Sequence, residues 1–180
     1  PGITVLSSFP VTIDSWAPRT FRVQFTRGAP GPLLDTLVIW TSDNGAEVMS
    51  WPDGGTIPFR GEKNTSWEGG YRVPMLMRYP KAIEPGTVSN GIVSLEDLLP
   101  TIMGVVGEDN IGEKLKVGHE VGGKTYKVHL DGYNFVPFLK GEGEWPRKGF
   151  FYFTDPGDLA AVRVGNWKAL FLEQRAEGLQ

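Results

Sequence analysis

Residues Thr36–Lys63 read TLVIWTSDNGAEVMSWPDGGTIPFRGEK, and this stretch indicates both a fold class and a site. Its first five residues, Thr36–Trp40, form a continuous, largely apolar run rather than an alternating one. Such a run is typical of a strand buried on both faces, as in a parallel sheet covered by helices. The residues from Thr41 to Glu62 are rich in Gly, Pro, Asp and Ser and predict a long loop. The stretch therefore predicts an α/β fold with a long loop, either functional or disordered, at the end of a buried strand.

Two oxygen-bearing side chains, Asp43 and Asn44, begin this loop. A carboxylate and an amide carbonyl are the hard ligands that Ca²⁺ and Mg²⁺ prefer. They follow the carboxyl end of the predicted strand, where open α/β sheets bind their ligands, and Gly45 permits a sharp turn. Asp-Asn-Gly is also an ordinary turn sequence, so the tripeptide alone leaves a metal site and a simple turn both open.

Lys63 stands at the end of the loop, just before NTSWEGGYR (64–72). A single loop lysine is ordinarily solvated, but the residues that follow could cover its aliphatic stem and fix its ammonium group. A fixed ammonium close to a metal ion suits an anionic ester, because both offer positive charge to the oxygens of the substrate.

The composition excludes several other classes of function. The net charge of the 180 residues is −3 and there is no long basic run, so a nucleic acid is not expected as a partner. The absence of cysteine excludes disulfides, thiolate metal sites and a cysteine nucleophile within this sequence. No apolar run approaches the roughly twenty residues that span a bilayer, and no signal peptide is recognisable. Oligomeric state is left open.

Further along the chain, RVPMLMRYP (72–80) predicts a strand and Ser94–Gly107 an apolar-faced helix. With Asp97 as N-cap, Pro100 becomes the third helical residue, where its missing donor does no harm. The stretch 114–134 predicts a hairpin turning at Gly122-Gly123, and FVPFLKG a short helical or irregular piece. GFFYFTD follows, and two strands are then expected around a turn at Gly165-Asn166, Leu159–Val164 and Trp167–Leu172. We therefore place a boundary near residue 108, with α/β structure before it and antiparallel β structure after it.

Taken together, these segments resemble the C-terminal portion of a sulfatase, of the arylsulfatase type in the alkaline-phosphatase-like superfamily. Six segments carry the resemblance, in order: TLVIWTSDNG, FRGEKNTSWEGGYRVPMLMRYP, SLEDLLPT, VHLDGYNFVPFLKG, FFYF and VRVGNWKALFLEQ. The resemblance implies the C-terminal part of an α/β sandwich with half of a metal site (36–107), then a small antiparallel β subdomain (108–180). It also implies a periplasmic or secreted location. The N-terminal stretch 1–35 does not match the family pattern.

The resemblance also implies roles for single residues. Asp43 and Asn44 match the second pair of divalent-cation ligands of the family, usually for Ca²⁺. Lys63 matches the lysine that contacts both the sulfate and the leaving-group oxygen. Glu68 and Arg72 lie in the same motif, and we predict that they form an ion pair supporting the loop.

One family element is missing from the sequence. Sulfatases use a formylglycine nucleophile, made from the first residue of a Cys/Ser-x-Pro-x-Arg motif. The nearest strings, SFPVT (8–12) and SWAPR (15–19), lack the arginine or misplace the proline. The nucleophile is therefore expected from a half of the protein that this chain lacks. His119 and His129, both in the predicted hairpin, are interpreted as packing residues rather than catalytic ones.

Three functions follow from these features. The first is a metal-assisted hydrolase of a small-molecule sulfate ester. The second is a phosphonate monoester or phosphodiester hydrolase on the same scaffold, because tetrahedral oxyanions of similar size fit the same site. The third is a catalytically incomplete fragment or interaction module, since two ligands supply few of the 6–8 oxygens that Ca²⁺ takes.

Overall fold

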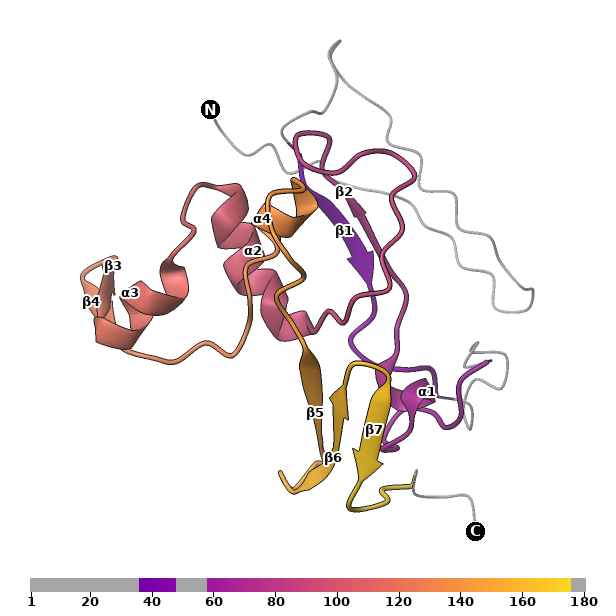
Figure 1. The fold of residues 1–180 in the computed structure, drawn as a ribbon. Helices are drawn as coiled ribbons and strands as arrows, with labels where there is room; N and C mark the ends of the chain where they lie inside the picture. Colours follow the sequence, from indigo (N-terminus) through magenta and orange to yellow (C-terminus); the bar gives the residue numbers. More distant parts are fainter. Residues whose placement is uncertain (1–35, 48–57, 176–180) are drawn as a thin grey trace, which may run out of the picture. The chain divides into compact units, whose positions relative to one another are not determined.

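The computed structural model describes residues 36–47 and 58–175. Strand β1 (Val38–Thr41) forms within the apolar run, and β2 (Met75–Arg78) forms where the second strand is predicted. The two strands pair in antiparallel fashion, with Ile39 opposite Met77 (Figure 1). The N-terminal stretch 1–35 lies outside the described residues.

The predicted surroundings of β1 differ from those in the structure. In the described part of the chain, β1 pairs with β2 alone and antiparallel to it, so the expectation of parallel neighbours was wrong here. Trp40 in β1 exposes 43% of its surface, so the strand is not buried on both faces either. A continuous apolar run indicates that both faces can be covered, but other segments must supply that cover.

The predicted helix forms in two parts, a 3₁₀ turn η1 (Leu95–Asp97) and the α-helix α2 (Leu98–Val105). Pro100 is the third residue of α2, as expected. The chain leaves the helix at Gly107, whose φ of 91° is readily adopted by glycine. The Asp97 side chain turns back instead of capping α2, because its Oδ2 accepts the Ser94 amide at 2.8 Å in a capping box around η1.

Asp97 also forms a buried ion pair with Arg147. The two side chains are 1% and 6% exposed, and the guanidinium donates from Nε at 2.8 Å and from NH2 at 2.7 Å to the two carboxylate oxygens. The Tyr133 amide donates to Asp97 Oδ1 at 2.8 Å, so the carboxylate joins the start of α2 to two later segments. This pair was not predicted from the sequence.

The region after α2 begins with α3 (Ile111–Val117), followed by the hairpin of β3 (His119–Val121) and β4 (Lys124–Tyr126). Gly122 and Gly123 have φ values of 59° and 75°, as the predicted hairpin turn requires. The expected hairpin was too long, because residues 114–117 belong to α3. FVPFLKG contains the short helix α4 (Val136–Leu139).

The last three strands form an antiparallel sheet in the order β5 (Gly149–Phe153), β6 (Leu159–Val164) and β7 (Trp167–Leu170) (Figure 1). β6 and β7 were predicted, and β5 lies in the segment GFFYFTD, which was expected only to belong to a region of antiparallel β structure. The buried residues Tyr152, Ala160 and Ala161 form a small core on this sheet, and Tyr71 packs edge-on to Tyr152 at 4.6 Å between ring centroids. Tyr71 ends the one-turn helix α1 (Glu68–Tyr71), so this core joins the sheet to the segment that follows Lys63.

The described residues all belong to one compact unit, Pro32–Gln180. The boundary near residue 108 stays a prediction. None of the helices in the described ranges has the length and apolar character that crossing a membrane requires.

Candidate functional site

The Asp-Asn-Gly loop and the Lys63 segment lie side by side. The Lys63 amide donates to the Ala46 carbonyl at 2.9 Å, and the Gly45 amide donates to the Gly70 carbonyl at 2.8 Å. A Cβ atom on Gly45 would lie 1.7 Å from the Gly69 carbonyl oxygen, so only glycine permits this approach. The backbones of the two predicted site segments are therefore fixed to each other.

Lys63 occupies a tight turn between Glu62 and Thr65. The Thr65 amide and hydroxyl both donate to the Glu62 carbonyl, at 3.1 and 2.7 Å, and the Glu62 amide donates back to Thr65 Oγ1 at 3.2 Å. Asn64 has a φ of 65°, a conformation that asparagine adopts more easily than most residues. Thr65 is buried, which shields these bonds from water. The turn fixes the backbone from which the partly buried Lys63 side chain extends.

The two predicted metal ligands follow β1 directly. Asp43 is exposed and Asn44 half-buried; the Asn44 amide group donates to the Gly45 carbonyl at 3.0 Å, and the Ser42 hydroxyl donates to the Asn44 carbonyl at 3.1 Å. Among residues 36–47 and 58–175, no group of three His, Cys, Asp or Glu side chains is arranged to hold a metal. The Asp43 carboxylate and the Asn44 amide oxygen are the kinds of ligand that a hard divalent cation takes. Together they would supply part of its coordination shell.

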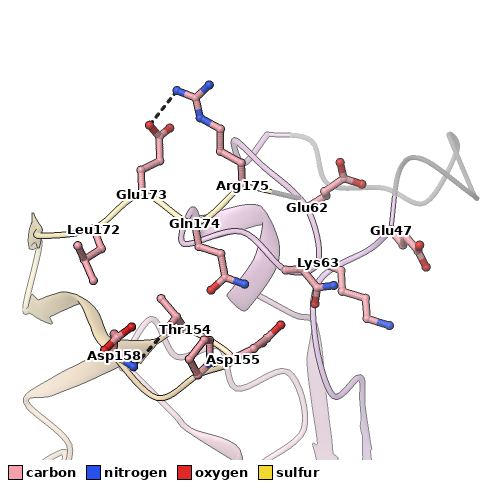
Figure 2. A pocket seen from close by; sticks show the side chains of 12 residues that line it. Glu47, Glu62, Lys63, Thr154, Asp155, Asp158, Leu172, Glu173, Gln174 and Arg175 are labelled. Carbon is pink, nitrogen blue, oxygen red and sulfur yellow. Dashed lines mark hydrogen bonds and ion pairs between the residues drawn. The ribbon is translucent and has the colours of Figure 1, made fainter. Parts of the chain in front are cut away.

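Lys63 lines a cavity of about 600 Å³ (Figure 2). Residues from four stretches of the chain surround it: Glu47, Glu62, Lys63, Asn64, Thr154, Asp155, Pro156, Asp158, Leu172, Glu173, Gln174 and Arg175. In the view of Figure 2, Lys63 lies on one side and Asp158 with Leu172 on the other. Five carboxylates and two cations make the lining acidic, and Glu173 is itself paired with Arg175 at 2.9 Å. Ten of the twelve lining residues thus carry charged or polar side chains.

Asp43 and Asn44 line a second, larger cavity of about 1180 Å³. The two cavities share Asn64, Asp155 and Gln174 in their walls, so they adjoin each other. The sequence signalled neither Asp155 nor Gln174, since both lie in ordinary-looking polar stretches far along the chain. Convergence of the Asp43, Asn44 and Lys63 side chains on one anion stays a prediction.

Glu68 joins the Lys63 segment to the C-terminal sheet. The predicted ion pair with Arg72 is present at 3.6 Å, but closer partners come from the sheet. The Tyr152 hydroxyl donates to Oε1 at 2.8 Å, Lys168 Nζ lies 3.0 Å from the same oxygen, and Arg163 NH1 lies 3.0 Å from Oε2. The Glu68–Arg72 pair was predicted because both residues lie in the same family motif, and the partners 84 to 100 residues away were missed.

These partners shift the pKa values of the cluster. Burial alone would raise the pKa of Glu68, but the hydrogen bonds from Tyr152 and Lys168 and the nearby charges of Lys168 and Arg163 lower it below its usual value. Burial, together with the hydrogen bond to the Glu68 carboxylate, raises the pKa of Tyr152 well above its usual value. Glu68 is therefore an ionised carboxylate held by cations, in a structural rather than a proton-transferring setting.

Neither of the two histidines belongs to the segments that line the two cavities. His119 begins β3, and His129 pairs with Asp131 at 3.3 Å while 64% of its side chain is exposed. His129 is a surface residue, and neither histidine lines the two cavities just described.

Comparisons with a family model and with known proteins all give sulfatases. The family model described as Sulfatase matches residues 24–108, which begins inside the stretch where no family resemblance was expected. Human arylsulfatase A is 37% identical over 152 residues, covering 82% of this chain and 27% of its own length. Mouse steryl-sulfatase is 33% identical over 151 residues, and this match covers 78% of this chain and 22% of the length of the mouse protein. The chain thus spans about a quarter of the length of these relatives.

Solved structures agree with the sequence relatives. The PsFucS1 sulfatase from Pseudoalteromonas sp. aligns with a TM-score of 0.60 and 34% identity, over 77% of this chain and 25% of that one. The structure of Ps i-CgsB in complex with k-i-k-neocarrahexaose aligns with a TM-score of 0.57 and 28% identity. This alignment covers 76% of this chain and 28% of that one. These matches confirm the predicted α/β fold. The chain belongs to the sulfatase family, and it matches the C-terminal portion of its longer relatives.

Proposed function

We propose that the protein containing this chain hydrolyses a sulfate monoester with the help of a divalent cation. The observation that carries the proposal is the hydrogen bond from the Lys63 amide to the Ala46 carbonyl, which joins the segment of the predicted lysine to the loop of the predicted ligands. A cation site and an ammonium group on adjoining backbones suit an ester of a tetrahedral oxyanion that carries one or two negative charges. Membership in the sulfatase family supports sulfate as that group.

In this proposal Lys63 acts on the leaving group. Its ammonium lies close to the oxygen that joins sulfur to the alcohol, where negative charge develops as the S–O bond breaks. Positive charge at that atom stabilises the transition state more than the ground state, so it raises kcat. The backbone of Lys63 is already fixed by its tight turn, so little further entropy is lost when its side chain is positioned on the substrate.

Asp43 and Asn44 are proposed to hold the cation, Ca²⁺ or Mg²⁺, together with ligands from outside this chain. The bound ion would supply positive charge to the non-bridging sulfate oxygens. Two oxygen ligands are fewer than the 6–8 that Ca²⁺ takes, so the site would be completed by other residues. The nucleophile, a formylglycine in this family, would also come from outside this sequence, which lacks Cys and Ser-x-Pro-x-Arg.

The test uses the full-length protein with Asp43→Ala. The expected result is loss of bound metal, measured by elemental analysis, together with loss of sulfate-ester turnover. Asp131→Ala is a matched control, because its carboxylate is 79% exposed and pairs with His129 on the surface. Unchanged metal content in Asp43→Ala would reject the assignment of this ligand.

A second measurement fixes the class of ester. The full-length protein is assayed with a sulfate monoester, a phosphate diester and a phosphonate monoester of the same alcohol. The proposal expects the sulfate ester to have the highest kcat/KM. A higher kcat/KM for either phosphorus ester would assign the protein to phosphorus chemistry, and no turnover of any ester would indicate a non-catalytic protein.

A further inference from the structure

We propose that Lys168 is a positioning residue for Lys63. This inference rests on the proposed function, in which Lys63 stabilises the leaving-group oxygen. Lys168 belongs to β7, more than a hundred residues from Lys63 along the chain, and 16% of its side chain is exposed. Its ammonium group contacts the segment that carries Lys63 at two points.

The first contact is with the backbone three residues after Lys63. Lys168 Nζ donates to the Ser66 carbonyl at 2.7 Å. Ser66 is 2% exposed, so this carbonyl accepts a charge-assisted hydrogen bond away from water. An ammonium on a buried carbonyl fixes the position of the peptide more firmly than a neutral donor would, and removing it leaves the carbonyl without this donor.

The second contact fixes Lys168 itself. Its Nζ lies 3.0 Å from Glu68 Oε1 and 3.6 Å from the centre of the Tyr152 ring. The carboxylate and the ring face both attract the ammonium, and they hold it over Ser66. The Lys168 side chain is therefore ordered before any substrate binds.

Backbone bonds transmit this position to Lys63. The Ser66 amide donates to the Gln174 carbonyl at 3.0 Å, and the Gln174 amide donates to Ser66 Oγ at 3.2 Å. Upstream of Ser66 is the closed turn of Glu62 and Thr65, and within that turn the Lys63 amide is bonded to Ala46. The backbone of this segment is thus fixed at Lys63 and again at Ser66, and Lys168 holds the second of these points.

Arg163 provides a matched comparison. It contacts the same carboxylate as Lys168, with NH1 3.0 Å from Glu68 Oε2, and its side chain is 19% exposed. Its other hydrogen bond goes to the Gly165 carbonyl, so among the described contacts it does not reach Ser66. Arg163→Met removes a cation from Glu68 as Lys168→Met does, but it leaves the Ser66 carbonyl bonded.

The experiment is a double-mutant cycle in the full-length protein. Lys168→Met is measured alone and in a Lys63→Ala background, with esters of good and poor leaving groups. Lys168→Met is expected to lower kcat about ten- to hundredfold for the poor leaving group, with little change in KM, because Lys63 is displaced from the bridging oxygen. In the Lys63→Ala background the same change should have an effect of less than about threefold. Arg163→Met should lower the melting temperature while kcat stays within about threefold.

Each outcome decides the proposal. An equal fall in kcat with and without Lys63 would show a general structural role and overturn the positioning role, while the proposed function would stand. Full activity of Lys63→Ala on the poor leaving group would overturn both. Should Lys168→Met fail to fold, Lys168→Gln, which is neutral but keeps a donor, is measured in its place with the same criteria.

Discussion

The amide nitrogen of Lys63 lies 2.9 Å from the carbonyl oxygen of Ala46, which joins two loops seventeen residues apart. The bond brings the predicted metal loop and the predicted lysine segment into backbone contact. The Gly45 amide also donates to the Gly70 carbonyl at 2.8 Å, so two backbone hydrogen bonds hold the pair of loops together. The arrangement depends on close packing of backbone on backbone, which small residues permit.

We expect Gly45→Ala to disrupt this contact. The new Cβ would meet the Gly69 carbonyl oxygen at 1.7 Å and the Gly70 Cα at 2.8 Å, and both are backbone atoms that cannot turn away. The free energy of unfolding should fall by about 1–3 kcal/mol or more, as for other overpacked sites, and ester hydrolysis should fall with it. Thermal melting and turnover of the full-length protein measure both effects.

Gly112→Ala is the control for that substitution. Gly112 lies in α3 with no atom within 4 Å of an added Cβ, and alanine is the better helix former by about 1 kcal/mol. This change should raise stability slightly and leave activity unchanged. A Gly45→Ala protein that melts and turns over like the wild type would show that the two loops are not packed as described.

The buried pair of Asp97 and Arg147 should be a major determinant of stability. Asp97→Ala removes the bidentate partner of a guanidinium that is 6% exposed and leaves it paired with Glu96 alone, so the loss of stability should reach up to about 3–5 kcal/mol, the cost of breaking a buried pair. Denaturant unfolding of the full-length protein gives the change. Glu144→Ala, which removes a pair with Lys148 whose side chains are 92% and 70% exposed, should change stability by less than about 1 kcal/mol. Equal effects of the two substitutions would contradict the buried pairing.

Glu68 should make stability depend on pH in the acid range. Its pKa is lowered in the folded state, so its contribution is complete above the unfolded value near 4.5 and is lost as the pH falls through the lower folded value. The melting temperature of Glu68→Gln should therefore lie below that of the wild type at pH 7, and the gap should shrink below pH 4.5. A gap of constant size from pH 7 to pH 3 would mean that the Glu68 charge does not stabilise the fold.

The sequence predicted the local elements because their signals are local. Pro100 and Asp97 locate the start of α2, Gly122 and Gly123 locate the first hairpin, and Gly165 and Asn166 locate the turn between β6 and β7. The pattern gave too long a hairpin, since the residues of α3 carry Val and Lys in an order that suits either a strand or a helix.

The long-range polar contacts could not be predicted in the same way. Asp97 and Arg147 are fifty residues apart, and Glu68 and Lys168 are a hundred apart, so no spacing rule connects them. Each charge reads as a solvated surface residue when seen alone, and only the fold brings the partners together. The site residues Asp43, Asn44 and Lys63 were proposed because a strand end and a family motif lie there, which are local signals again.

The most direct measurement of the central claim is the dependence of kcat on the leaving group in Lys63→Ala. The full-length protein and the variant are compared over a series of sulfate esters whose alcohols differ in pKa. We expect kcat of the variant to fall most for the alcohols of highest pKa, because these leaving groups need the most charge stabilisation. An equal fall for every ester in the series would contradict the account and assign Lys63 to sulfate binding alone.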